Sequence, residues 1–386
     1  MKVVVLGAAG GMGSVAARIA AGFTFVEELV VADSNGDAAA RVARAIGEPA
    51  QPLQLDIGEG AALAGTVGRA DAVLNCVVPF FRFGVPVLQA CIEAGVDYLD
   101  INDDWEPTLD MLEHDGAARE AGITAVVGIG ASPGVSNLLA TLAMGQLDSA
   151  DTLHTGWGLG GAGGGEAATE PSAAVVHFIH QITGTVRLRR GGRWTDVVPL
   201  EEVSLNYPGI GTGSGWTVGH PEPLTVPRYY PNIADSTNLV VTSPRVIEGL
   251  RAVAHAVDTG AIDVVSGARE LLRPVPPSPE PAPARAPSPG IRLPELFAIA
   301  MGAKGGQPAT AAASITASPP GGMGGITGVP LALGLQMLHE LDDTPAGVFA
   351  PEALLDANRF FELLGPYCEP PPVPGSPLVA IARSWD

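Results

Sequence analysis

Residues 1–20 have the sequence MKVVVLGAAGGMGSVAARIA, and the pattern of this stretch indicates the fold class. The apolar, β-branched run Val3–Leu6 is typical of a strand buried in a parallel sheet, and Ser14–Ala21 has helical spacing. A glycine-rich turn, GAAGGMG, joins the two. The first N–H groups of a helix lack partners within the helix, and the helix dipole favours negative charge. The turn therefore predicts an anion-binding strand–turn–helix unit.

The glycine turn predicts a site for a dinucleotide. Gly7, Gly10 and Gly13 have the spacing G-x-x-G-x-x-G, and Gly11 is an extra glycine, so the turn is one residue longer than the usual G-x-G-x-x-G. The sequence leaves open whether Gly10 or Gly11 allows the close approach of a phosphate. The predicted cofactor-binding residues are Gly7, Gly10, Gly11, Met12, Gly13, Asp33, Ser34, Asp56, Cys76, Val77 and Pro79.

Asp33 bears on the choice of cofactor. It closes the second predicted strand, twenty residues after Gly13, where a carboxylate accepts hydrogen bonds from a ribose 2′-hydroxyl. A carboxylate repels a 2′-phosphate, and Ser34 and Asn35 follow it rather than an arginine. NAD is therefore the expected cofactor, with NADP possible.

Strand and helix patterns alternate through the first 130 residues. Further strands are predicted at 28–33, 52–57, 70–78, 97–101 and 123–130, and the helices between them at 37–46, 85–95 and 109–121. Such a series predicts an α/β fold, with a doubly wound parallel sheet of the Rossmann type.

After residue 130 the pattern changes to hairpins, so we expect an inserted α/β domain with a mixed or antiparallel sheet. One hairpin is predicted to turn at Gly191-Gly192 and another near Gly305-Gly306, with helices at 328–341 and 351–364. The predicted division is a dinucleotide-binding domain at 1–130, a substrate and dimerisation domain at 131–345 that contains a proline-rich loop at 273–290, and a segment at 346–386 that returns to the first domain.

Composition excludes several classes of protein. The 386 residues are 46% hydrophobic and carry a formal charge of −20, which suits a well-buried enzyme and disfavours binding to nucleic acid or anionic membrane. The three cysteines are widely spaced and without a C-x-x-C pair, so neither a disulfide framework nor a zinc site is expected. No apolar run is long enough for a membrane span, and we expect a cytoplasmic protein.

The opening turn resembles the start of the malate dehydrogenases, which would imply a hydroxy-acid dehydrogenase. That resemblance ends at about Gly13, because no stretch resembles the arginine-bearing loop or the histidine segment of that family. The alternative stays open at this point.

Other stretches resemble the saccharopine dehydrogenase-like (saccharopine reductase) family, in order along the chain. The stretch 71–101 has Asn-Cys, a proline, Cys-x-x-Ala-Gly and Tyr-x-Asp, and 133–140 has Pro-Gly-x-x-Asn-Leu-Leu-Ala. The stretches 321–338 and 347–356 carry its Thr-Gly-x-Pro helix and Pro-Glu segment. The resemblance implies NAD(P)-dependent hydride transfer at the carbon of an amine or imine, usually on an amino-acid skeleton, and a homodimer. A non-catalytic NAD(H)-binding relative is a further alternative.

Imine reduction needs a proton donor, and substrate carboxylates usually need cations. Ligands of open α/β sheets lie at the carboxyl ends of the strands, and Asp100 is at the carboxyl end of the fifth predicted strand. The catalytic candidates are Asp100, Asp103, His177 and His220, and the last of these lies in the stretch 219–228, whose prolines indicate a loop. The substrate-binding candidates are Arg82, Asn102, Arg187 and Arg228. His177 and His180 share a helix face, but no third ligand is evident, so no metal is predicted.

Overall fold

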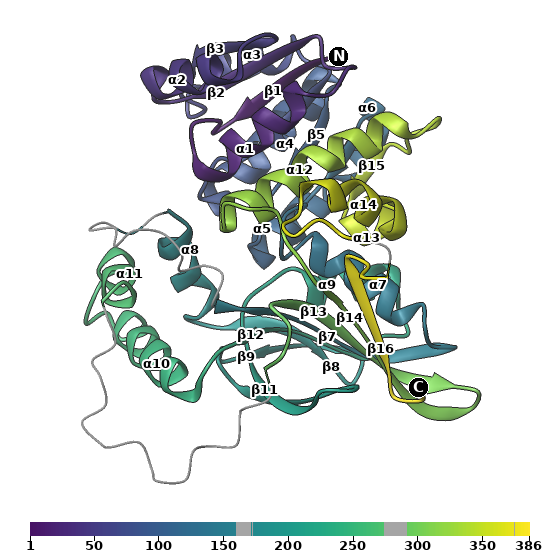
Figure 1. The fold of residues 1–386 in the computed structure, drawn as a ribbon. Helices are drawn as coiled ribbons and strands as arrows, with labels where there is room; N and C mark the ends of the chain where they lie inside the picture. The colour runs from purple at the N-terminus through teal and green to yellow at the C-terminus, as the bar shows by residue number, and fades with distance from the viewer. Residues whose placement is uncertain (160–170, 172, 274–291, 374) are drawn as a thin grey trace.

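The computed structural model describes residues 1–159, 171, 173–273, 292–373 and 375–386. Two sheets with their helices form two domains, joined by several crossings of the chain (Figure 1). The predicted proline-rich loop, from residue 274 onward, lies outside the described residues.

The first sheet has seven parallel strands in the order β15-β6-β5-β4-β1-β2-β3. Their bounds are β1 Lys2–Leu6, β2 Glu28–Asp33, β3 Ala50–Gln54, β4 Ala72–Asn75, β5 Asp97–Asp100, β6 Thr124–Val126 and β15 Gly347–Phe349. The central strands are buried because helices cover both faces, which explains their continuous apolar runs. The prediction of a doubly wound α/β sheet is confirmed.

The helices of this domain are α1 Gly11–Ala21, α2 Gly36–Ile46, α3 Gly60–Val67, α4 Phe80–Ala94, α5 Trp105–Leu112 and α6 Asp115–Ala121. The single helix predicted at 109–121 is wrong, since α5 ends at Leu112 and α6 begins at Asp115. The break turns α6 toward the edge of the sheet, where the carboxylate of Asp115 accepts a hydrogen bond from the N–H of Val348 at 3.0 Å.

The second sheet is mixed and has nine strands, with the path β10-β11-β12-β7-β13-β14-β16 and the β8–β9 hairpin attached to β12. Their bounds are β7 Ser149–Gly158, β8 Val186–Arg190, β9 Arg193–Val197, β10 Glu202–Tyr207, β11 Gly211–Thr217, β12 Asp235–Val241, β13 Leu296–Lys304, β14 Gln307–Ile315 and β16 Val379–Arg383. Both predicted hairpins are confirmed, because β8–β9 turns at Gly191-Gly192 and β13–β14 at Gly305-Gly306, all four glycines having positive φ.

The helices of the second domain are α7 Val135–Met144, α8 Ala173–Gln181, α9 Glu222–Tyr229, α10 Pro244–Asp258 and α11 Val264–Leu271. The stretch from Pro221 to Arg228, interpreted from its prolines as a loop, forms α9 instead. Pro221 is the N-cap of this helix and Pro223 lies in its first turn, where the missing N–H groups cost no hydrogen bond.

The chain returns to the first domain earlier than the predicted residue 346. Helix α12 (Met323–Glu340) packs along α1 through Gly324 and Gly328, whose added Cβ atoms would lie 3.0 Å from the carbonyl oxygen of Gly11 and 2.5 Å from that of Met12. The short strand β15 then joins the sheet beside β6, followed by α13 (Pro351–Leu354), α14 (Ala357–Leu364) and a 3₁₀ turn, η2 (Gly365–Tyr367).

The last strand does not stay with the first domain. β16 pairs antiparallel with β14, so the segment 346–386 ends in the second sheet. The single helix predicted at 351–364 is also two, α13 and α14. One hydrophobic core runs from the first sheet through α7, α12 and α14 to the near face of the second.

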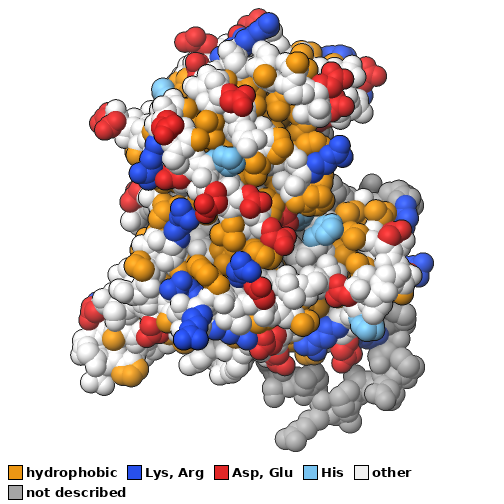
Figure 2. Space-filling view, turned by 180° about the vertical axis from the view of Figure 1, so that it is seen from behind, with side chains coloured by type: hydrophobic (Ala, Val, Ile, Leu, Met, Phe, Trp, Pro, Cys, Tyr) orange, Lys and Arg blue, Asp and Glu red, His pale blue; other side chains and the backbone are white. Residues whose placement is uncertain are grey.

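No helix among the described residues is both long and apolar enough to span a membrane. On the face shown in Figure 2, basic side chains are interspersed with acidic ones and do not form a continuous stripe.

Candidate active site

The glycine loop between β1 and α1 fits a dinucleotide pyrophosphate. Gly7 has φ +71°, and an added Cβ there would lie 2.9 Å from the carbonyl oxygen of Cys76. At Gly13 an added Cβ would lie only 2.3 Å from the carbonyl oxygen of Gly7. Gly7 is therefore required by the turn and Gly13 by the close packing of α1 against the loop.

The two remaining glycines differ in what surrounds them. Gly10 caps α1, and its N–H is occupied by the carbonyl oxygen of Gly7 at 3.1 Å. Gly11 is the first helical residue, is exposed, and would place a Cβ where no atom lies within 4 Å. The half-buried Met12 follows it in the first helical turn. The open space above the helix N-terminus therefore lies at Gly11.

Asp33 stands beside this loop, at the end of β2. Its Oδ2 accepts the N–H of Ala9 and its Oδ1 that of Asn35, each at 3.0 Å, and each oxygen keeps a lone pair for a further donor. A shallow pocket follows, lined by Ser34, Asn35, Gly36, Asp37 and Gln54, without lysine or arginine in its lining. Because a carboxylate accepts hydrogen bonds and repels an anion, this site fits a ribose diol better than a 2′-phosphate.

The other predicted cofactor residues lie on loops after their strands. Asp56 is exposed and accepts the N–H of Gly58 at 2.8 Å, so its carboxylate is engaged within its own loop. Cys76 and Val77 follow β4, and Pro79 caps α4. Burial raises the pKa of the Cys76 thiol far above its usual range, which leaves it unreactive near neutral pH.

Asp100 was predicted as a catalytic residue and Asn102 as a substrate contact, and the side chains of both are engaged inside the protein. Asp100 is fully buried and accepts the N–H groups of Asn102 and Gly128 and the hydroxyl of Tyr98. Burial raises the pKa of Asp100 to about 6 against the lowering effect of these bonds. Asn102 is also fully buried and bonds to Asp104 and Thr108. Both residues hold the loop after β5 in shape.

That loop carries an ion pair to the second domain. Nε2 of His177, on α8, lies 2.8 Å from Oδ1 of Asp103 and 3.2 Å from Oδ1 of Asp104. Although burial alone would lower it, the two carboxylates raise the pKa of His177 to about 9. Gln181, one helical turn further, donates to Oδ2 of Asp103 at 3.0 Å. Nε2 of His177 is therefore engaged with carboxylates of the first domain, and the pair joins the two domains.

His220 lies in a second buried cluster, built around Glu222. Its Nδ1 is 3.4 Å from Oε2 of Glu222 and 3.4 Å from Oγ of Ser132. Oε1 of Glu222 accepts hydrogen bonds from Ser132, from Ser136 at 2.6 Å and from Asn238 at 2.9 Å. Since Nδ1 faces this carboxylate, Nε2 is the ring nitrogen left for a ligand.

The electrostatics of the cluster keep Glu222 ionised. Burial would raise the pKa of Glu222, but His220 and the hydroxyls of Ser132 and Ser136 lower it below its ordinary value. His220 also lowers the pKa of Asp103 across the junction, next to the larger effect of His177 and against that of burial. The two clusters therefore lie near each other at the junction of the two domains.

The predicted arginines do not form a free carboxylate clamp. Arg187 is paired through Nε and Nη2 with Asp196 and lies 5.2 Å over the ring of Trp105, so it ties β8 to β9 and to α5. Arg82 is exposed at the start of α4 and stacks on its neighbour Phe83 at 4.8 Å. Arg228 is exposed near the end of α9. The roles of these arginines as substrate contacts remain predictions. For Arg187, the pairing with Asp196 argues against a substrate contact.

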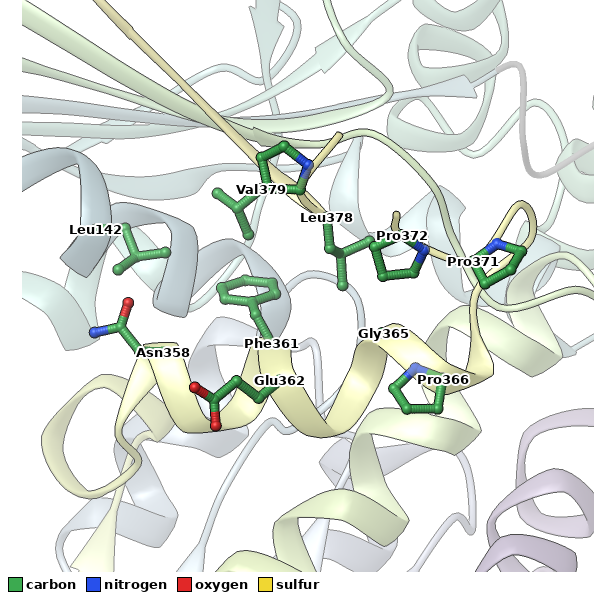
Figure 3. Close-up of a pocket in the computed structure, with 11 residues that line it drawn as sticks. Leu142, Asn358, Phe361, Glu362, Gly365, Pro366, Pro371, Pro372, Leu378 and Val379 are labelled. Carbon is green, nitrogen blue, oxygen red and sulfur yellow. The ribbon is translucent and has the colours of Figure 1, made fainter. Parts of the chain in front are cut away.

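Within the described part of the chain, no three His, Cys, Asp or Glu side chains are grouped to hold a metal ion. A separate pocket, lined mostly by proline and aliphatic side chains, lies between α7, α14 and the C-terminal strand (Figure 3). Glu362 is the one ionisable residue among those lining it.

Several residues of the cluster escaped prediction from sequence. Glu222 follows His220 by two positions, but the surrounding prolines suggested a loop. Asn238 and Trp157 lie on β12 and β7, and Trp157 donates from Nε1 to Oδ1 of Asn238 at 3.0 Å. Only the pairing of these strands brings them to His220, whose ring centre is 5.6 Å from that of Trp157.

Parts of this chain are similar in sequence to known proteins. Residues 3–126 match the family model described as the saccharopine dehydrogenase NADP binding domain. Carboxyaminopropylagmatine dehydrogenase from a Synechocystis species is 27% identical over 286 residues, which cover 71% of this chain and 70% of that protein. A trans-acting enoyl reductase from Mycobacterium leprae is 28% identical over 142 residues, 35% of this chain and 34% of that protein.

The fold is shared over the whole length with a solved structure. Apo saccharopine dehydrogenase (L-Glu forming) from Saccharomyces cerevisiae has a TM-score of 0.63 to this chain, covers 99% of both chains and is 14% identical. These findings confirm the resemblance predicted from the sequence and the binding of a nicotinamide dinucleotide. Residues 3–126 match the saccharopine dehydrogenase NADP binding domain, and the chain is an oxidoreductase with the saccharopine dehydrogenase fold.

Proposed function

We propose that this protein transfers hydride to or from the carbon of an amine or imine on an amino-acid-like substrate, with His220 as the acid/base. The observation that carries the assignment of His220 is its contact with Glu222, at 3.4 Å between Nδ1 and Oε2. A carboxylate on one ring nitrogen fixes the tautomer and leaves the other nitrogen to exchange a proton.

The proton transfer follows from the buried carboxylate. With Nδ1–H directed at Glu222, Nε2 accepts a proton from a substrate amine, and the ionised carboxylate stabilises the imidazolium that forms. In the reverse direction Nε2 returns the proton to the nitrogen. The bound nicotinamide supplies or accepts the hydride.

The residues around His220 limit what else the site can do. Ser132 is 3.4 Å from Nδ1 of His220, the same nitrogen that faces Glu222. A serine nucleophile would need one ring nitrogen while the carboxylate held the other, so the cluster does not fit the arrangement of a hydrolase triad. The cluster does fit acid/base catalysis on a substrate bound next to Nε2 of His220.

The named substrate of one relative agrees with chemistry at a C–N bond. The Synechocystis relative is a dehydrogenase of carboxyaminopropylagmatine. We infer for this chain a substrate of the same general class, a secondary amine formed between an amine and an oxo acid, without assigning its identity.

The test compares oxidation of NADH and NADPH with three mixtures: an oxo acid with a primary amine, the oxo acid alone, and the amine alone. The proposal predicts turnover only where an imine can form, and its loss in His220→Gln. Turnover with the oxo acid alone would favour the hydroxy-acid alternative. Cofactor binding without turnover on a broad amine panel would favour a non-catalytic relative.

We further propose a homodimer located in the cytoplasm, as the family resemblance and the composition suggest. Light scattering at two protein concentrations measures the mass in solution against the 39.3 kDa of one chain. A mass that stays at one chain at both concentrations contradicts the dimer.

A further inference from the structure

Two of the stretches that resemble the family, 133–140 and 347–356, meet inside the protein. Asn137 on α7 donates from Nδ2 to Oε2 of Glu352 on α13 at 2.7 Å, across 215 residues of sequence. Oδ1 of Asn137 accepts the N–H of Gly134 at 2.8 Å. One amide therefore connects Glu352 to the loop that enters α7.

That loop, residues 130–134, is tightly closed. The N–H of Gly130 donates to the carbonyl oxygen of Pro133 at 2.9 Å, and an added Cβ at Gly134 would lie 2.2 Å from the carbonyl oxygen of Gly130. Because the loop has no room to adjust, a shift of Gly134 carries Ser132 with it. Ser132 is the residue that donates to Glu222 beside His220.

Glu352 is an unusual residue for this position. It is 6% exposed, and its Oε1 has no hydrogen-bond partner among the described residues. Burial raises the pKa of Glu352 to about 7. The ionisable groups whose charges interact with Glu352 are Glu222 and Tyr229 of α9 and Tyr230 just after it, while α7 has only uncharged side chains.

A buried carboxylate with an unsatisfied oxygen costs stability, and an apolar side chain would avoid that cost. The hydrogen bond between Asn137 and Glu352 connects Glu352 to the candidate active site, because Oδ1 of Asn137 also accepts the N–H of Gly134. The hydroxyl of Thr225 lowers the pKa of Glu352 against the larger effect of burial and accepts from Nδ2 of Asn137 at 3.4 Å, so it belongs to the same network. The contact with Asn137 therefore suggests a positioning role.

We propose that Glu352 is a positioning residue that acts through Asn137 to hold the 130–134 loop, and with it Ser132 and Glu222, in the arrangement that orients His220. The inference rests on the proposed function in one respect only, the role of His220 as the acid/base. The arrangement of the His220 ring is measurable without catalysis.

The experiment compares Glu352→Ala, Glu352→Gln and Glu362→Gln in the full chain. The glutamine variant at this position keeps an oxygen that accepts from Asn137, whereas the alanine variant keeps none. Glu362, whose side chain is 70% exposed on α14, is the matched control from the same returning segment. Ring ¹⁵N chemical shifts of His220 report its tautomer without cofactor or substrate, and kcat and KM are measured in parallel.

We expect Glu352→Ala to change the His220 ring shifts and to lower kcat about tenfold, with the cofactor KM within about twofold, which corresponds to about 1.4 kcal/mol in the barrier. Glu352→Gln and Glu362→Gln should keep both signals near those of the unaltered protein. If Glu352→Ala does not fold, Glu352→Asp, whose carboxylate is too short to reach Asn137, takes its place.

Unchanged ring shifts in Glu352→Ala, or equal losses in the alanine and glutamine variants, would overturn the positioning role. A different result separates the two proposals. If the ring shifts change in Glu352→Ala while His220→Gln retains full turnover, the positioning role stands and the assignment of His220 as acid/base fails.

Discussion

The carboxylate of Asp33 accepts the N–H of Ala9 at 3.0 Å, so the end of β2 is tied directly to the glycine loop after β1. The predicted ribose contact and the loop predicted to bind the pyrophosphate are therefore held together. We therefore expect the preference for NAD or NADP to depend on the Asp33 side chain.

Asp33 is expected to favour NAD because its carboxylate repels a 2′-phosphate and accepts from a 2′-hydroxyl. The unaltered protein should bind NADH at least about tenfold more tightly than NADPH, about 1.4 kcal/mol. Asp33→Ser should remove this preference, measured by cofactor fluorescence titration. Asp342→Ser, on an exposed loop after α12, is the control. Tighter binding of NADPH by the unaltered protein would show the preference to be wrong.

Gly11 is expected to be the glycine at which the phosphate approaches the loop. Gly11→Ala places a methyl group in the open space at the N-terminus of α1 and should weaken NAD binding at least about tenfold without lowering the melting temperature. Gly65→Ala, a glycine in α3 with equally open surroundings, should leave binding unchanged. Equal binding by both variants, measured by calorimetry, would place the phosphate elsewhere.

His220 and Glu222 are expected to act together in proton transfer. His220→Gln should lower kcat about a hundredfold and Glu222→Gln about tenfold, while the Kd for cofactor changes little, because general acid/base catalysis contributes rate rather than cofactor affinity. Steady-state kinetics and cofactor titration measure the two effects. His255→Gln, exposed on α10, serves as the histidine control. A His220→Gln variant with unaltered kcat would exclude this role.

The pair of His177 with Asp103 and Asp104 is expected to make stability depend on pH. The folded state raises the pKa of His177 from 6.5 to about 9, so its contribution is fully present below pH 6.5 and is lost as pH rises through 9. His177→Gln should therefore lower the free energy of unfolding on the order of 2 kcal/mol at pH 6.

Urea unfolding at pH 6 and at pH 9.5 measures this difference. The two proteins should converge at the higher pH, where the imidazole is neutral in the unaltered protein and absent from the variant. A constant difference at both pH values would mean that the lost contribution is packing and not charge.

The sequence predicted the features that depend on local pattern. Apolar runs placed the strands of the first sheet, and paired glycines placed the turns at 191–192 and 305–306. It did not predict the position of β15, because three residues carry no usable periodicity and their partner β6 lies far away in sequence. It also missed α9, because prolines that usually mark a turn here occupy the first turn of a helix.

The residues of the candidate site were predictable only where the residue type itself suggests chemistry. His220 and Asp103 were found because their residue types suggest chemistry. The role of each side chain depends on a partner in another element, which is Glu222 for His220 and His177 for Asp103. Asp100 shows the converse, because a carboxylate at a strand end suggests a ligand contact until its three internal hydrogen bonds are seen.

The order in which the chain supplies its strands has a consequence for synthesis. β15, which closes the cofactor-binding sheet, and β16, which closes the second sheet, both come from the last forty residues. A nascent chain therefore leaves the ribosome with the open edges of β6 and β14 exposed, and such edges invite pairing with other chains. A chain that stops before Gly347 therefore lacks one strand of each sheet, and neither domain is complete without the C-terminal residues.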